Sequence, residues 1–142
     1  MILLASTGAP ALPGSELQAR YGTVSGTPPA LDLAAEAALI RFVTEAAPRC
    51  SLAHDVSDGG LAVALAEAAL HSGVGAYLDV SLDAVSLFGE GCGQVILALP
   101  SDQLETDPLG SDVAVRRIGE VGGDEILGVG LTRLRAAWER EG

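Results

Sequence analysis

A run of strand length leads directly into a pair of glycines and then into a helical stretch, and this order limits the fold more than any other feature. Residues 51–56 form a mixed apolar run, and residues 57–60 contain the pair Gly59-Gly60. The next stretch, residues 61–71, has a helical period, with apolar positions at Leu61, Ala64, Leu65, Ala68 and Ala69. A strand that turns straight into a helix packs that helix against its sheet. The chain is therefore expected to place helices on a sheet.

The remaining pattern predicts one α+β domain over residues 1–142. Strands are predicted at 2–5, 76–80 and 94–99, with one or two helical turns at 83–88, a polar connection at 101–112 and a terminal helix at 131–141. Residues 33–47 are predicted to form a helix whose buried face carries Leu33, Ala37, Ile40, Val43 and Ala47. Residues 113–121 and 125–129 are predicted to pair as a hairpin. This hairpin argues against a purely parallel sheet, so a three-layer α/β/α arrangement with a mixed β-sheet is expected.

Composition excludes several classes of function. Eight basic residues face nineteen acidic ones, which gives a net charge of −11, and aromatic residues make up only 4%. Such a surface repels phosphate backbones and anionic lipid, so neither nucleic acid nor a membrane is an expected partner. Every basic residue is Arg, which rules out a Walker-A phosphate loop. No apolar run approaches the ~18 residues of a membrane span, and Cys50 and Cys92 are expected to be reduced thiols, so a cytoplasmic location is expected.

The densest polar cluster lies between the predicted strand and helix at residues 51–71. Its candidate ligand-binding residues are His54, Asp55, Ser57, Asp58, Gly59 and Gly60. Backbone N–H groups at a helix start suit a phosphate, and Asp55 or Asp58 could hold a Mg²⁺ ion bridged to it. A structural interpretation is the alternative, in which Ser57 or Asp58 caps the helix, the glycines make the turn, and His54 and Asp55 satisfy buried polar groups. No nucleophile signature surrounds Ser57, so a catalytic serine is not supported.

A second cluster, residues 89–94, is rich in glycine and contains Glu90. It precedes a strand, whereas a dinucleotide-binding fingerprint follows one, so that function is rejected. Glu90 is a candidate metal or substrate ligand, and a solvated side chain is the alternative. Cys92 has no neighbouring base in the sequence that would activate its thiol. Residues 14–16 are predicted to be a helix start.

Taken together, these segments resemble the phosphoribosylformylglycinamidine synthase family. Residues 53–67, from Ala53 to Glu67, closely match its signature, and segments 13–16, 26–32, 87–90, 118–121 and 136–139 match in order. The sequence departs from the family at Leu17 and at residues 91–94. The resemblance implies a fold similar to the C-terminal domain of aminoimidazole ribonucleotide synthetase. It also implies a carbon–nitrogen ligase, in which ATP activates an amide oxygen and ammonia from glutamine displaces phosphate.

The family resemblance further implies partners and cofactors. The full enzyme would use ATP and Mg²⁺, and the chain would be a fragment whose N-terminal nucleotide-binding domains and glutaminase partner lie elsewhere. The isolated chain is therefore expected to be inactive and to bind no cofactor tightly. Two alternatives stay open at this stage: a non-catalytic scaffold or interaction domain, and a domain of a related ATP-using enzyme of hydrogenase maturation or selenophosphate synthesis. Also open are a homo-oligomeric state and whether the loop lines a catalytic or an auxiliary nucleotide site.

Overall fold

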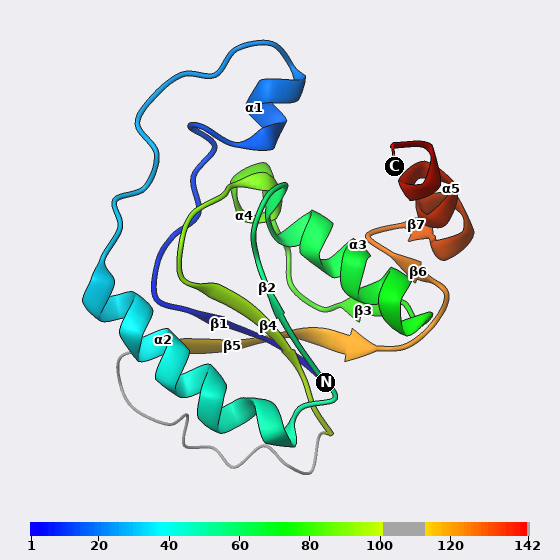
Figure 1. The fold of residues 1–142 in the computed structure, drawn as a ribbon. Helices are drawn as coiled ribbons and strands as arrows, with labels where there is room; N and C mark the ends of the chain where they lie inside the picture. Colours follow the sequence, from blue (N-terminus) through cyan, green and yellow to red (C-terminus); the bar gives the residue numbers. More distant parts are fainter. Residues whose placement is uncertain (101–112, 142) are drawn as a thin grey trace.

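A five-stranded sheet forms the centre of the protein (Figure 1). The computed structural model describes residues 1–100 and 113–141, so the predicted connection at 101–112 lies outside the described residues. The strand order is β2-β4-β1-β5-β3. The strands are β1 (Ile2–Ser6), β2 (Leu52–Asp55), β3 (Ala76–Leu78), β4 (Gln94–Ala98) and β5 (Ala114–Val121).

Strand direction follows from the helical crossovers. Helix α2 (Leu33–Ala46) connects β1 to β2, and α3 (Gly60–Ser72) connects β2 to β3, so β1, β2 and β3 run the same way. Strands β4 and β5 insert between them in the opposite direction, and all four pairings in this sheet are antiparallel. The α+β class is confirmed. A mixed β-sheet was expected. Strands β1, β2 and β3 do run the same way, but β4 and β5 lie between them, so no two neighbouring strands of this sheet pair in parallel.

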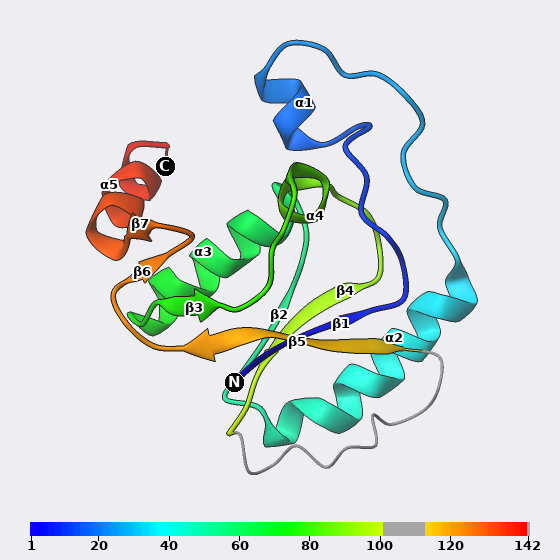
Figure 2. The same ribbon diagram turned by 180° about the vertical axis from the view of Figure 1, so that it is seen from behind.

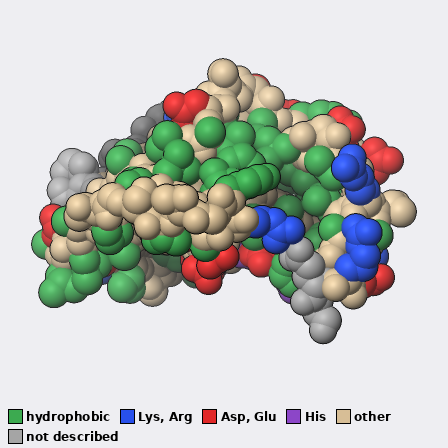
Figure 3. All heavy atoms as spheres, turned by 90° about the horizontal axis from the view of Figure 1, so that it is seen from above, with side chains coloured by type: hydrophobic (Ala, Val, Ile, Leu, Met, Phe, Trp, Pro, Cys, Tyr) green, Lys and Arg blue, Asp and Glu red, His purple; other side chains and the backbone are tan. Residues whose placement is uncertain are grey.

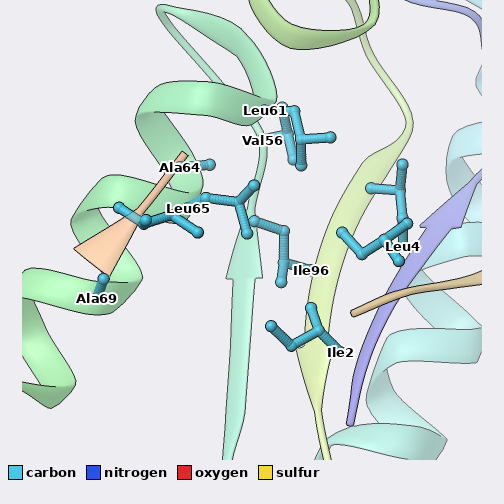
Figure 4. Close-up of a cluster of buried hydrophobic side chains, with 10 residues drawn as sticks. Ile2, Leu4, Val56, Leu61, Ala64, Leu65, Ala69 and Ile96 are labelled. Atoms are coloured by element: carbon cyan, nitrogen blue, oxygen red, sulfur yellow. The ribbon is translucent and has the colours of Figure 1, made fainter. Parts of the chain in front are cut away.

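Strand β1 is buried on both faces and separates two cores (Figure 2). Ile2 and Leu4 face α3, whereas Leu3 and Ala5 face α2, because successive side chains of a strand alternate. On the α3 side, Leu61 and the side chains labelled in Figure 4 point toward one another between helix and sheet. The predicted three layers are therefore present, with one helix on each face of the sheet.

Helix α2 begins where the sequence predicts and ends one residue earlier, at Ala46, but it buries a different face. Asp32 caps it, with Oδ1 accepting from the N–H groups of Ala34 and Ala35, and a 3-10 turn η1 (Ala47–Arg49) follows it. The buried residues are Ala38, Leu39, Phe42 and Ala46. Two residues of the predicted face, Leu33 and Ile40, are 74% and 65% exposed. The helix is apolar on more than one side, so periodicity alone selected the wrong face.

The predicted hairpin of residues 113–129 is wrong. Strand β5 pairs with β1 and β3, while β6 (Glu125–Ile126) pairs with β7 (Val129–Gly130). The turn of the short hairpin is Leu127-Gly128, and both residues have positive φ, of 52° and 75°, as a type I′ turn requires. The glycines at 122 and 123 instead continue the strand pairing toward Gly75, with N–H···O distances of 2.9 Å.

The described residues also contain the helices α1, α4 and α5. Helices α1 (Glu16–Arg20) and α4 (Ala84–Phe88) are short, and α5 (Leu131–Glu141) ends the described chain. Helix α5 contacts α3, its Leu131 and Leu134 pack against the core, and its Trp138 is exposed. Among the helices in the described part of the chain, none has the length and apolar character that crossing a membrane requires.

Candidate functional site

A pocket of about 530 Å³ opens at the carboxyl end of β2. Three segments line it: one side of α2, the residues that follow β2, and the loop that leads into β4. Four of the predicted site residues meet there, namely Asp55, Ser57, Asp58 and Glu90. The three others, His54, Gly59 and Gly60, are not among the residues that line the pocket.

Asp55 and Ser57 form one polar unit at the edge of the pocket. The Ser57 hydroxyl donates a hydrogen bond to Oδ2 of Asp55. This bond is the main reason that the pKa of Asp55 is held below its ordinary value, and the neighbouring His54 contributes less. The Asp55 carboxylate is therefore ionised and oriented at neutral pH. The N-cap of α3 is Gly59 and no side chain of its own segment caps the helix, so the prediction that Ser57 or Asp58 caps α3 is wrong.

The start of α3 is capped by a residue from elsewhere in the chain. Its N-cap is Gly59, with φ of 83° and no side-chain cap of its own. The Gly59 N–H donates to Oε1 of Glu90 at 2.8 Å, and the Gly60 N–H donates to the carbonyl oxygen of Ser57 at 3.0 Å. The glycines do make the turn, as predicted. Both N–H groups predicted to hold a phosphate thus have internal partners, so an anion could reach them only by displacing these bonds.

Glycine at position 60 is required by a close approach of the chain. A Cβ there would lie 2.7 Å from the carbonyl oxygen of Gly89 and 2.8 Å from that of Leu87. Real Cβ atoms do not approach backbone atoms so closely. Gly60 thus lets the end of α4 and Gly89 lie directly against the start of α3, which brings Glu90 to Gly59.

His54 lies on the α3 side of the site. Its Nδ1 is 2.6 Å from the carbonyl oxygen of Asp55, and its Nε2 is 3.5 Å from Oε2 of Glu67 on α3. A carbonyl oxygen only accepts, so Nδ1 carries a proton in this arrangement. His54 therefore links β2 to α3 and supports the loop between them from the α3 side.

The pocket carries one sign of charge. Among the described residues that line it, the ionisable acids are Glu36, Asp55, Asp58 and Glu90, and no basic side chain joins them. Three Arg residues, Arg133, Arg135 and Arg140, lie instead on α5, and Figure 3 shows Arg side chains at one end of the face in view. Within residues 1–100 and 113–141, no group of three or more His, Cys, Asp and Glu side chains is arranged to hold a metal ion. The pocket therefore repels a bare phosphate and lacks a complete metal site.

One wall of the pocket was not predicted from the sequence. It is formed by one side of α2, including Leu39, Ile40, Val43 and Thr44. Sequence periodicity gave no signal for this wall, since it placed Ile40 on the buried face of α2, whereas Ile40 is 65% exposed. Cys92 also lines the pocket and is exposed.

The family described as AIR synthase related protein, C-terminal domain, matches residues 2–132. The chain belongs to this family. The match contains every predicted site residue from His54 to Glu90, and it ends at the first turn of α5. The AIR synthase-related fold thus covers both cores and the pocket, whereas most of α5 lies beyond it.

Curated relatives are similar over most of the chain. The phosphoribosylformylglycinamidine synthase subunit PurL of Nocardioides sp. is 40% identical over 127 residues, which cover 83% of this chain and 17% of the relative. The PurL subunits of Thermobifida fusca and Thermoplasma acidophilum are 39% and 35% identical, over 84% and 90% of this chain and 17% and 19% of their own lengths. The chain thus spans less than a fifth of the length of these relatives.

Proposed function

We propose that this chain is the C-terminal domain of a phosphoribosylformylglycinamidine synthase, a carbon–nitrogen ligase of purine biosynthesis. The reaction would convert formylglycinamide ribonucleotide to the amidine with ATP and ammonia from glutamine. The names of relatives at 35–40% identity support this function. The loop that carries the family resemblance is also the loop that borders the pocket, at Asp55, Ser57 and Asp58.

The acidic pocket is the observation that carries the proposal. A phosphorylated substrate needs positive charge, and the described lining of this pocket offers carboxylates only. The pocket is therefore one wall of a composite site, and the missing charge comes from a divalent cation and from other domains. One domain of a long synthetase is expected to have this form, because the catalytic site would lie between domains.

Two side chains fit the role of partial Mg²⁺ ligands. Asp55 and Asp58 both line the pocket, and Asp55 is ionised and held by Ser57. Mg²⁺ in phosphate sites is commonly bound by one or two carboxylates together with phosphate oxygens and water. The Mg²⁺ ion would neutralise the charge of the phosphate, and the two carboxylates of this chain would orient the ion. Asp55 and Asp58 would hold the phosphate end of a ligand, while His54 and Gly60 would support their loop.

The partners follow from the same proposal. N-terminal nucleotide-binding domains of the synthetase would complete the site, and a glutaminase would supply ammonia. The chain alone is expected to be inactive, and the complete assembly is expected in the cytoplasm. In such a reaction the protein contributes by positioning reactants and by stabilising charge.

A titration of the isolated chain tests the dependence on other domains. ATP with Mg²⁺ is added while the amide resonances of Asp58, Gly59 and Gly60 are followed by NMR. We expect millimolar binding at best, because the lining lacks positive charge. Saturation at micromolar ATP would overturn the dependence on missing domains.

Reconstitution tests the catalytic role. The chain is joined to the remaining synthetase domains and glutaminase of a relative, and amidine formation is measured for Asp58→Ala. Turnover should fall while folding is retained, and the control Asp124→Ala, an exposed acid that does not line the pocket, should leave turnover unchanged. Full turnover in a folded Asp58→Ala assembly would support a scaffold and overturn the proposed site.

A further inference from the structure

The carboxylate of Glu90 joins two helix starts that are far apart in the sequence. Its Oε1 accepts from the N–H of Gly59 at 2.8 Å and from the N–H of Glu16 at 2.7 Å. The first N–H lies at the N-cap of α3, and the second belongs to the first residue of α1. Both groups lack partners within their own helix, and each attracts a negative charge. One ionised oxygen therefore satisfies both.

The backbone around Glu90 is itself held in place. Its N–H donates to the carbonyl oxygen of Ala11 at 2.9 Å, and the N–H of Ala11 donates back at 3.0 Å. A Cβ at the preceding Gly89 would lie 3.0 Å from the backbone nitrogen of Ala11, so the two segments are in close contact. A fixed backbone on both sides limits the positions that the Glu90 carboxylate can take.

Three segments that resemble the synthase family thus meet at one side chain. The segments are residues 13–16, 53–67 and 87–90, and they contribute Glu16, Gly59 and Glu90 to the two hydrogen bonds. Sequence reasoning treated Glu90 as a candidate metal or substrate ligand. A carboxylate oxygen with two N–H donors already has the partners of an internal anion, and this leaves little lone-pair capacity on that oxygen for a cation.

We propose that Glu90 is a positioning residue, whose carboxylate holds the starts of α1 and α3 together and so places the 55–60 loop at the pocket. In this role its Oε1 accepts from two N–H groups and is not a metal ligand. The proposal that Glu90 holds the two helix starts together rests on the observed hydrogen bonds alone. The consequence for ligand binding rests on the proposed function, since it requires that the loop contact a ligand.

Amide hydrogen exchange in the full chain tests the hydrogen bonds. Glu90→Gln keeps an oxygen acceptor and loses the charge, whereas Glu90→Ala removes both. In Glu90→Ala, exchange at Gly59 and Glu16 should accelerate together, by roughly tenfold or more, because hydrogen bonds to a charged group are lost. Glu90→Gln should restore most of the protection at both sites. Unchanged exchange in Glu90→Ala, or a change at only one of the two amides, would overturn the proposal.

Asp32 provides a matched control. Its Oδ1 also accepts from two N–H groups at a helix start, those of Ala34 and Ala35. Asp32→Ala should accelerate exchange at these two amides and leave Gly59 and Glu16 unchanged. Acceleration at Gly59 and Glu16 in the control would mean that general loosening, and not Glu90, sets their protection.

The reconstituted synthetase then separates positioning from ligation. If Glu90 positions the loop, Glu90→Gln should keep turnover and the Mg²⁺ requirement close to those of the parent, whereas Glu90→Ala should lower turnover. If Glu90 were a Mg²⁺ ligand, Gln and Ala should raise the Mg²⁺ requirement alike, and that result would overturn the proposal. The exchange measurement requires no activity, so failure of the proposed function would leave it intact.

Discussion

Replacing Gly60 by alanine tests whether close packing, as well as backbone conformation, sets the start of α3. At Gly60 φ is +70°, and a Cβ would lie 2.7 Å from the carbonyl oxygen of Gly89. At Gly73, the C-cap of the same helix, φ is +71° and nothing lies within 4 Å of the Cβ position. The two alanine variants therefore share the backbone strain, and only Gly60→Ala adds a contact with other backbone atoms.

The expected losses differ because of that contact. An L-residue in the left-handed region costs about 1–2 kcal/mol, and alanine regains about 0.4–1 kcal/mol by restricting the unfolded chain. Gly73→Ala should therefore lower the free energy of unfolding by about 1 kcal/mol. Gly60→Ala must also displace the segment after α4, which adds about 1–3 kcal/mol. Its total loss should be about 2–4 kcal/mol.

Urea and thermal unfolding, followed by circular dichroism, measure both losses. For a chain of this size 1 kcal/mol shifts the melting temperature by roughly 4 °C, so Gly60→Ala should melt about 4–12 °C below Gly73→Ala. Spectra of both variants establish that each starts from the native fold. Equal losses in the two variants would refute the role assigned to the contact with Gly89.

Three further outcomes are expected. The bond from Ser57 holds the pKa of Asp55 below its ordinary value of 3.8, so its stabilisation is present above that value and is lost as pH falls through the lower folded-state pKa. Ser57→Ala should thus be less stable than the parent at neutral pH, and urea midpoints of the two should converge in acid; a constant difference contradicts this. Leu127→Asn should raise the free energy of unfolding by up to about 1 kcal/mol, since φ at Leu127 is 52° and Asn tolerates the left-handed region; chemical denaturation that shows a loss contradicts this. Burial raises the pKa of the Cys50 thiol, so iodoacetamide at mildly alkaline pH should alkylate the exposed Cys92 first, as peptide mass mapping would show; equal rates would contradict the difference in environment.

Local sequence signals predicted what depends on near neighbours. The order of strand, glycine pair and helix at residues 51–72 was read correctly, because alternation, helical period and glycine each act over a few residues. The helix start predicted at residues 14–16 was also found, since the capping side chain of Ser15 and its N–H partner lie close together in the chain. The acids at and after the end of β2 likewise indicated where the pocket lies, while their role in binding stays a prediction.

Long-range packing decided what such signals do not contain. The N–H of Gly59 is satisfied by Glu90, 31 residues away, and the same carboxylate reaches Glu16 across 74 residues. Likewise β5 pairs with β1 and β3 and not with β6, its neighbour in the sequence. Strand β6 pairs instead with β7, so residues 125–130 form a separate short hairpin. Helix α2 is apolar on several sides, and only the position of the sheet determined that Phe42 is buried and Ile40 lines the pocket. A backbone N–H group or an apolar side chain can be satisfied by any suitable partner that the fold brings near. Which partner it has is therefore determined by the tertiary structure and not by the local sequence.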